Sequence, residues 1–289
     1  MKEIMNHRKI TQWICTGILF LLFTGTAVAQ EPLNPVQLSK IQTVGSVYLH
    51  EDGNLGAYTL SVPADPMKEN TLPSSQLYFL DVSSGGSVAV ETEVSVASVA
   101  FRPGKKTITF LAKYEGDESR SLYEFDPEDG KRTKLFEFER NINSFEWAAD
   151  GDHFIFLAEE PKNESESQLP YQPEIYEEGL SNTWAYMQNA SKEGHMPHRI
   201  PVEGDVVAAH WSPDLSKIAI AVAPTSLVDD FYMAQKIYIV DHQTREVTAT
   251  IDHEGKLGSF SWCPESKHLA MIAAATLNDP IDGRIKIAD

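Results

Sequence analysis

The sequence is short of cysteine, of basic residues and of long apolar runs, and each shortage excludes a class of protein. Two of its 289 residues are Cys, and its 24 Lys and Arg residues are outnumbered by 42 Asp and Glu residues, giving a formal net charge of −18. Binding to nucleic acid or to an anionic membrane surface requires a basic patch, so we expect neither as a partner. A hydrophobic content of 42% with 23% charged residues is ordinary for a globular chain with a sizeable core.

The longest apolar run lies near the N-terminus, in the layout of a secretory signal peptide. Three basic residues precede an apolar run at 18–23, and Ala27-Val28-Ala29 forms a cleavage site of the A-x-A type. The alternative, an uncleaved membrane anchor, needs about 20 apolar residues, whereas the stretch at 13–29 is shorter and contains Thr and Gly. We therefore expect residues 1–29 to be removed and the chain to be exported to the periplasm or the outside of a bacterium, without membrane contact afterwards.

Cleavage of the signal makes the net charge more negative and leaves fewer cysteines. It removes three basic residues and one acidic residue, so the exported chain carries 21 basic and 41 acidic residues, a net charge of −20. Cys15 leaves with the signal and only Cys263 remains, so no internal disulfide is expected even in an oxidising compartment. No small residues precede Cys15 as they do a lipidated cysteine, so we predict no lipid anchor.

After the signal, one pattern recurs five times. In each copy a small residue is followed three positions later by a bulky anchor and then by a Pro or acidic turn. An apolar pair follows seven and nine positions past the anchor, except in the first and weakest copy, which has only Gly56 and Tyr58 there. The anchors are Leu49, Phe101, Trp147, Trp211 and Trp262, at spacings of 52, 46, 64 and 51 residues. Each copy predicts a strand that ends at the anchor, a tight reversal, and a second strand whose apolar pair shares one face.

Alternating segments at 76–81, 121–126 and 236–241 supply further strands. Four strands in a unit of about 40–50 residues are typical of a β-propeller blade. The regular anchors argue against the alternative, a β-sandwich of unrelated hairpins. The sequence therefore predicts an all-β fold, a β-propeller with four-stranded blades, of which about four and a half are present and which is incomplete at the C-terminus.

The signal and the repeat together predict how the chain is divided. A signal peptide at 1–29 is followed by an N-terminal segment at 30–43 with a short helix, for which Asn34 is the N-cap, Pro35 the first residue and Ile41 the end. The blades are expected at 44–94, 95–139, 140–203 and 204–252, with a partial blade at 253–289. An open blade is a liability, so we expect either a fragment of a longer protein, which we favour, or closure of five blades by the N-terminal segment.

Few residues have the patterns of catalysis or metal binding. The nucleophile elbow G-x-S-x-G is missing from the sequence, so we assign no catalytic triad. His195 and His198 have near metal-ligand spacing but no third ligand or helix to align them, and we expect a solvated loop. His210, beside Trp211 in a strand, is expected to be structural. We predict no catalytic residue, no metal site and no cofactor in this chain.

The spacing of 64 residues marks an insertion in the third blade, at 160–180, that is polar, acidic and rich in Pro. It contains Tyr176, Glu177 and Glu178. Two adjacent carboxylates at a propeller rim are able to bind a cationic amine through charge-assisted hydrogen bonds. The alternative is an acidic, solvated stretch before a strand at 181–187, which is the usual role of a charge run.

Five segments resemble a known family. Residues 33–53 and 57–66 look like the start of secreted bacterial serine peptidases of the prolyl oligopeptidase family, in their dipeptidyl-peptidase and acylaminoacyl-peptidase-like branches. Segments 211–219, 228–233 and 277–284 are similar to later blades of the same propellers. The resemblance implies a propeller of seven or eight blades that filters peptides, joined to a C-terminal α/β-hydrolase domain that holds the catalytic Ser, Asp and His.

The resemblance also bears on the site and on the function. Tyr176, Glu177 and Glu178 match the segment that holds the free amino terminus of substrates in the dipeptidyl-peptidase IV branch, although Gly179 departs from it. We expect the propeller part of an exported serine peptidase, itself non-catalytic, with peptides and its own hydrolase domain as partners. The alternatives are a stand-alone periplasmic TolB-like propeller that binds proteins and a five-bladed glycosidase, which has only its blade count in favour.

Overall fold

The computed structural model describes residues 32–65, 67–68, 70–161, 177, 179–191, 194 and 196–289, so the predicted signal peptide lies outside the described residues. The chain divides into two units, 1–41 and 42–289. In the part of the chain that is described, no helix is long and apolar enough to cross a membrane.

The first unit contains the helix α2 (Pro35–Leu38). Asn34 caps it as predicted: its side chain accepts the backbone N–H of Gln37 at 2.9 Å, and the Gln37 side chain accepts the N–H of Asn34 at 3.0 Å. The helix ends at Leu38, so its predicted extension to Ile41 is wrong. No residue of α2 is buried, and a short helix without tertiary packing is not stable enough to extend.

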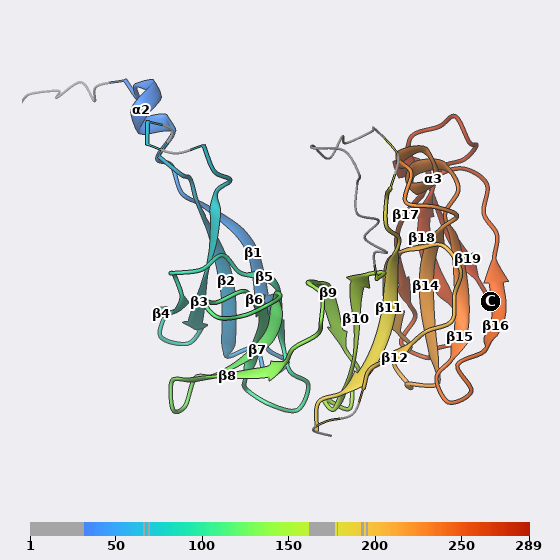
Figure 1. Ribbon diagram of the computed structural model, residues 1–289, viewed down its shortest axis with the longest axis horizontal. Helices are drawn as coiled ribbons and strands as arrows, with labels where there is room; N and C mark the ends of the chain where they lie inside the picture. Colours follow the sequence, from blue (N-terminus) through green and yellow to red (C-terminus); the bar gives the residue numbers. More distant parts are fainter. Residues whose placement is uncertain are drawn as a thin grey trace, which may run out of the picture. The chain divides into compact units, whose positions relative to one another are not determined.

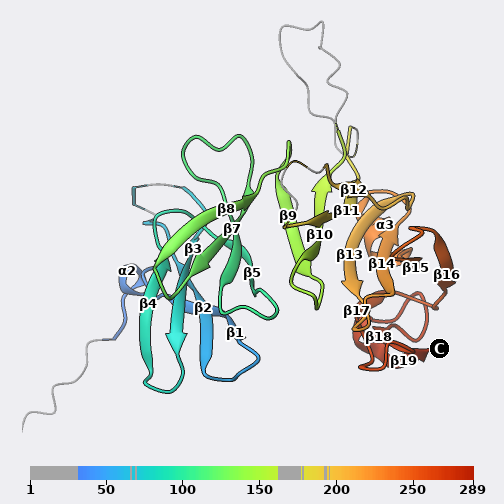
Figure 2. The same cartoon turned by 90° about the horizontal axis from the view of Figure 1, so that it is seen from below.

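The second unit consists almost entirely of strands, arranged as five antiparallel sheets in which the strands follow one another in chain order (Figures 1 and 2). We call these sheets blades one to five. Blade one contains β1 (Thr43–Leu49), β2 (Leu55–Val62), β3 (Ser74–Asp81) and β4 (Gly86–Glu91), and blade two contains β5 (Ala97–Phe101), β6 (Ile108–Ala112), β7 (Ser121–Asp126) and β8 (Lys131–Phe136). Blade three contains β9 (Ile142–Trp147), β10 (His153–Glu159), β11 (Thr183–Asn189) and β12 (His198–Arg199).

Blade four contains β13 (Asp205–Trp211), β14 (Lys217–Ala223), β15 (Lys236–Asp241) and β16 (Val247–Ile251). Blade five has three strands, β17 (Leu257–Trp262), β18 (Leu269–Ala273) and β19 (Arg284–Ala288). Four four-stranded sheets and one of three strands are the blades of a β-propeller, so the predicted fold class is confirmed.

The five anchors have the role that the repeat predicts. Each is the last residue of the first strand of its blade, and each pairs across the hairpin with the residue seven positions later, as Trp147 does with Phe154 and Trp211 with Ile218. Four of the anchors, Phe101, Trp147, Trp211 and Trp262, also pack between blades, whereas Leu49 is 66% exposed. The indole N–H of Trp147, for example, donates to the Thr109 hydroxyl of blade two at 2.8 Å.

The core lies between consecutive blades. Each of its four clusters combines side chains of two neighbouring sheets: blades one and two, two and three, three and four, and four and five. The first strands of neighbouring blades are in contact, and the indole of Trp262, at the end of β17, donates to the carbonyl of His210, near the end of β13, at 3.1 Å. These first strands therefore run side by side in the same direction.

Every first strand also has a break in its pairing register within the five residues before its anchor. The breaks fall between residues 44 and 47, 97 and 100, 142 and 144, 206 and 208, and 257 and 260. Such a bulge leaves an extra residue outside the ladder and increases the local twist. Its recurrence makes it a property of the blade rather than an irregularity of one hairpin.

Two short helices lie between strands and were not predicted. Helix α3 (Val228–Met233) follows β14, and the 3₁₀-helix η1 (Ile281–Gly283) precedes β19. Helix α3 has no side-chain N-cap, and its first turn carries Asp229 and Asp230. Because six residues give too few turns for an apolar period, this helix leaves no clear pattern in the sequence.

Candidate functional site

The insertion of blade three lies between β10 and β11. Because the strands of each blade alternate in direction and the first strands run parallel, the connection after the second strand leaves every blade at the same end. We call this the insertion end; it also carries α3 and η1. Of the three predicted site residues, Glu177 is exposed and has a left-handed backbone with φ of 61°, whereas Tyr176 and Glu178 lie outside the described residues.

Hydrogen bonds hold the two ends of the insertion together. The N–H of Glu160 donates to the carbonyl of Asn182 at 2.8 Å, and the N–H of Asn182 donates to the Glu160 carboxylate at 2.9 Å. The next N–H, of Thr183, donates to the Asp205 carboxylate of blade four at 2.6 Å. Glu177 precedes Asn182 by five residues, so even an extended chain keeps it within about 18 Å of this clasp.

Carboxylates gather near the clasp. A cavity of about 220 Å³ is lined by Glu118, Ser119, Glu139, Arg140, Asn141 and Glu159. Its three carboxylates outnumber its one guanidinium, so it is a site of negative potential. Burial raises the pKa of Asp205; hydrogen bonds from Thr183 oppose this effect, and the neighbouring charge of Glu160 adds to it. The chemistry that such a group of acids supports is attraction of a cation, for example a protonated amine.

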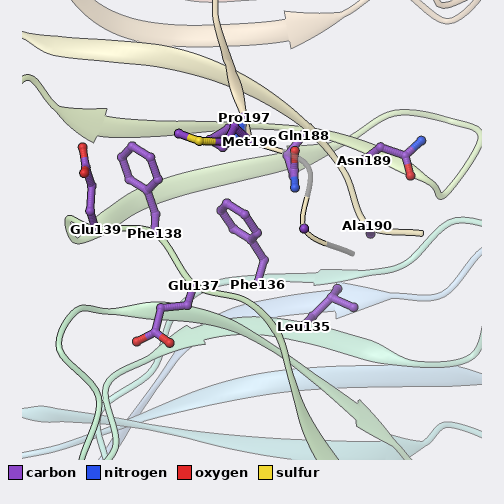
Figure 3. Close-up of a pocket in the computed structure, with 11 residues that line it drawn as sticks. Leu135, Phe136, Glu137, Phe138, Glu139, Gln188, Asn189, Ala190, Met196 and Pro197 are labelled. Carbon is purple, nitrogen blue, oxygen red and sulfur yellow. The ribbon is translucent and has the colours of Figure 1, made fainter. Parts of the chain in front are cut away.

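A second cavity, of about 450 Å³, lies between blades two and three (Figure 3). Phe136, the last residue of β8, and Phe138, two residues later, point into it, and Met196 and Pro197 lie across from them. The Phe138 ring lies 5.1 Å from that of Phe156, so these aromatic side chains belong to the packing between the two blades. Core packing accounts for this cavity, and we assign no chemistry to it.

The predicted structural histidine forms a contact that the sequence does not indicate. His210 Nδ1 lies 2.6 Å from a carboxylate oxygen of Glu146, and the other oxygen accepts the N–H of Trp211 at 3.0 Å. Glu146 precedes His210 by 64 residues, and only the side-by-side placement of β9 and β13 brings the pair together. Of the two histidines with near metal-ligand spacing, His198 lies in β12 and His195 lies outside the described residues.

Comparisons with known proteins bear on the fold. No family model and no curated protein matches the sequence. Among solved structures, Pyrococcus horikoshii acylaminoacyl peptidase matches with a TM-score of 0.60 at 14% identity, over 89% of this chain and 39% of that one. The β-propeller domain of the trilobed protease from Pyrococcus furiosus matches with a TM-score of 0.53 at 16% identity, over 87% of this chain and 69% of that one.

TolB from Acinetobacter baumannii is similar as well, with a TM-score of 0.50 at 18% identity, over 85% of this chain and 54% of that one. At these identities the similarity establishes the β-propeller fold and leaves activity open, since one fold carries many functions. The chain spans only about two fifths of the length of the acylaminoacyl peptidase.

Proposed function

We propose that residues 44–289 are the propeller part of an exported serine peptidase of the prolyl oligopeptidase type, which admits peptides and orients them for an α/β-hydrolase domain outside residues 1–289. The observation that carries this proposal is the propeller fold shared with the acylaminoacyl peptidase, together with the share of that longer chain that it covers. The lack of a G-x-S-x-G elbow in the sequence agrees with cleavage in another domain.

The insertion end is the proposed place for the amino terminus of the peptide. Glu177 and Glu178 are acids that a protonated amine would pair with, and Tyr176 adds a hydroxyl. The exposure of Glu177, its tether to the clasp at Glu160 and Asn182, and the acidic cavity beside Glu159 support this role.

The first experiment is to sequence the genomic DNA past codon 289. An open frame with G-x-S-x-G followed by Asp and His is expected, and a stop codon directly after Asp289 would contradict the proposal. Given that frame, the full-length protein is expected to hydrolyse short peptides and to lose this activity to a fluorophosphonate, whereas residues 30–289 alone hydrolyse none. Activity of the full-length protein that resists the fluorophosphonate would contradict the serine mechanism.

The amine site is tested separately with Glu177→Gln in the full-length protein. Loss of one charge-assisted contact of about 1.5 kcal/mol is expected to raise KM about tenfold for peptides with a free amino terminus and to leave Nα-acetylated peptides unchanged. The control is Glu128→Gln, in the exposed turn between β7 and β8 at the opposite end of blade two. An equal effect on both classes of peptide would mean that Glu177 does not bind the amine.

The match to TolB favours one other function, a stand-alone periplasmic propeller that binds a protein partner. Residues 30–289 would then form a monomer that unfolds cooperatively, because a self-sufficient propeller leaves no blade face uncovered. A chain that aggregates or unfolds gradually would argue against this second function.

A further inference from the structure

A cavity of about 500 Å³ lies between blades four and five at the insertion end and has no part in the site described above. Its walls come from β13, β14 and β17 and from the helices α3 and η1. Its size falls in the range of ligand sites, which run from about 300 to 1,000 Å³. A smaller cavity of about 150 Å³, lined also by β9, shares the β13 residues Val207, Ala208 and His210 with it.

The walls of the larger cavity are mainly aromatic and aliphatic. Phe231 and Tyr232 of α3 stand perpendicular to each other with ring centres 5.1 Å apart, and both are exposed, at 39% and 48%. Phe260 of β17 also belongs to the lining, and its ring centre is 4.8 Å from that of His210. Two neighbouring exposed aromatic rings beside a preformed cavity are a typical surface for recognising an apolar side chain.

The polar groups of the lining suit a peptide main chain. The Glu146 carboxylate accepts a hydrogen bond from His210 Nδ1, so the lone pair of the neutral ring is on Nε2, which has no hydrogen-bond partner among the described residues. That nitrogen is therefore able to accept a peptide N–H. Val207 and Gly258, also in the lining, lie at the bulges of β13 and β17, where a residue is left outside the ladder.

The charges of the lining select among peptides. Glu146 and His210 are the ionisable side chains among the described lining residues of the two cavities apart from Tyr232, and neither lining contains Lys or Arg. In a chain of net charge −18, this end is unfavourable for an acidic ligand. A basic residue beside the apolar one would instead gain from the half-exposed Glu146 carboxylate.

We infer that the cavity between blades four and five is a side-chain subsite that binds an aromatic residue of a peptide, followed by a basic residue near Glu146, with His210 Nε2 accepting a main-chain N–H. The inference rests on the proposed function in one respect, that the ligand is a peptide. It adds a preference for aromatic-basic sequences, set by blades four and five and independent of the peptide's amino terminus.

The experiment measures binding by calorimetry to the protein as the cell exports it, with its natural C-terminus and with any catalytic serine blocked by a fluorophosphonate. The probe is acetyl-Gly-Phe-Arg-Gly-amide, which has no free amine. Replacing Phe by Ala in the probe is expected to weaken binding at least tenfold, and so is replacing Arg by Glu. Equal affinity of the Phe and Ala probes would overturn the inference.

Matched variants locate the subsite. Tyr232→Ala removes an exposed ring without opening the core and is expected to reduce the preference for Phe over Ala at least fivefold. Leu72→Ala, an exposed apolar residue before β3, is the control and should leave the preference unchanged. A Tyr232→Ala protein that keeps the full preference would also overturn the inference.

The outcomes separate this inference from the proposed function. Tighter binding of the Phe-Arg probe without any fluorophosphonate-sensitive hydrolysis would support the subsite and contradict the proposed peptidase function. Hydrolysis of peptides with no preference for Phe over Ala would support the peptidase and overturn the subsite. Glu177→Gln should leave the affinity of the acetylated probe unchanged, and a tenfold loss there would place the probe in the amine site and overturn the subsite.

Discussion

At the scale of single residues, Glu91 at the end of β4 is an acid held by several partners. It is 3% exposed, and its carboxylate accepts the N–H groups of Glu93 and Val94 and the hydroxyl of Tyr114, the last at 2.5 Å. Arg132 pairs with it, and the Arg132 guanidinium lies 4.1 Å from the centre of the Tyr114 ring. One acid of blade one thus binds both a loop and the outer strand of blade two.

Glu91→Gln is therefore expected to reduce the free energy of unfolding by about 2 kcal/mol, because hydrogen bonds to a charged group contribute about 1.5–3 kcal/mol. Glu93→Gln, two residues away and exposed, is the control and should change it by less than about 0.5 kcal/mol. Urea denaturation at pH 7 measures both. Equal losses for the two variants would mean that the network around Glu91 does not stabilise the protein.

The pH dependence follows from the pKa of Glu91. Burial alone would raise it, but the hydrogen bonds from Tyr114, Val94 and Glu93 and the charge of Arg132 together bring it below its ordinary value of 4.5. A lowered folded-state pKa stabilises the protein above the ordinary value, and this contribution is lost as the pH falls below 4.5 and through the folded-state value. The gap between wild type and Glu91→Gln should narrow over that acidic range, as urea curves at successive pH values would measure, and a gap that widens would contradict this account.

Pairings of this kind are what the sequence does not reveal. Tyr114 and Arg132 follow Glu91 by 23 and 41 residues, and Glu146 meets His210 across 64 residues. Each partner looks like an ordinary polar residue until the register of two blades is fixed. The predicted site of the insertion is a different case, because a sequence motif marks Tyr176, Glu177 and Glu178, of which only Glu177 is among the described residues.

At the scale of elements, the strands were predictable because the repeat places the residues that pair across each hairpin at a fixed spacing. An anchor pairs with the residue seven positions later in every blade, so spacing alone gave the hairpins, and the segments predicted at 121–126 and 236–241 are β7 and β15. Strand β11 begins at Thr183 rather than at 181 because the clasp of Glu160 and Asn182 precedes it. Helices α3 and η1 were not predicted because six and three residues give too few turns for an apolar period.

Turns of neighbouring hairpins are also joined, and Gly151 tests this link. Its φ is 67°, its carbonyl accepts the Arg102 Nε at 2.6 Å, and an added Cβ would lie 2.3 Å from the carbonyl oxygen of Pro103. Gly130 has nearly the same φ, 69°, but nothing within 4 Å of its Cβ position. Alanine at either position meets the same left-handed strain of about 1–2 kcal/mol, so the difference between them isolates the contact between blades.

We expect Gly130→Ala to lower the free energy of unfolding by about 1 kcal/mol and Gly151→Ala by about 3 kcal/mol or more, because the second also separates two hairpin turns. Denaturant unfolding followed by tryptophan fluorescence measures both, since Trp147 lies at the same junction. Losses of equal size would mean that the turns of blades two and three adapt without strain.

At the scale of the whole molecule, the first and last blades each present an apolar face that other blades bury. Ile237 and Ile239 of β15 are buried between blades four and five. The corresponding residues of blade five, by pairing register, are Ile285 and Ile287 of β19, and these are 78% and 70% exposed. In blade one, Val47 is exposed, whereas Val99 at the same position of blade two is buried.

Each interface between blades joins the β15-type face of one blade to the face of the next blade that carries the residue equivalent to Val99. The exposed faces of blades five and one are of these two kinds, so they are able to pack against each other. Residues 30–289 by themselves are therefore expected to self-associate as their concentration rises. The double variant Ile285→Lys, Ile287→Lys should reduce this association without loss of strand content, since both side chains are already exposed and Lys carries charge to the edge of the sheet. Sedimentation velocity over a range of concentrations measures the effect.

Leu72→Lys is the control for this experiment, because Leu72 is an exposed apolar residue in the connection before β3. If it reduces association as much as the double variant does, net charge and not the blade face is responsible, since both changes add positive charge to an acidic chain. If only the double variant acts, the face formed by β18 and β19 behaves as an uncovered blade interface. In the full-length protein, another blade would then cover this face. The two lysines would be buried in that protein and would destabilise it, although they leave residues 30–289 folded.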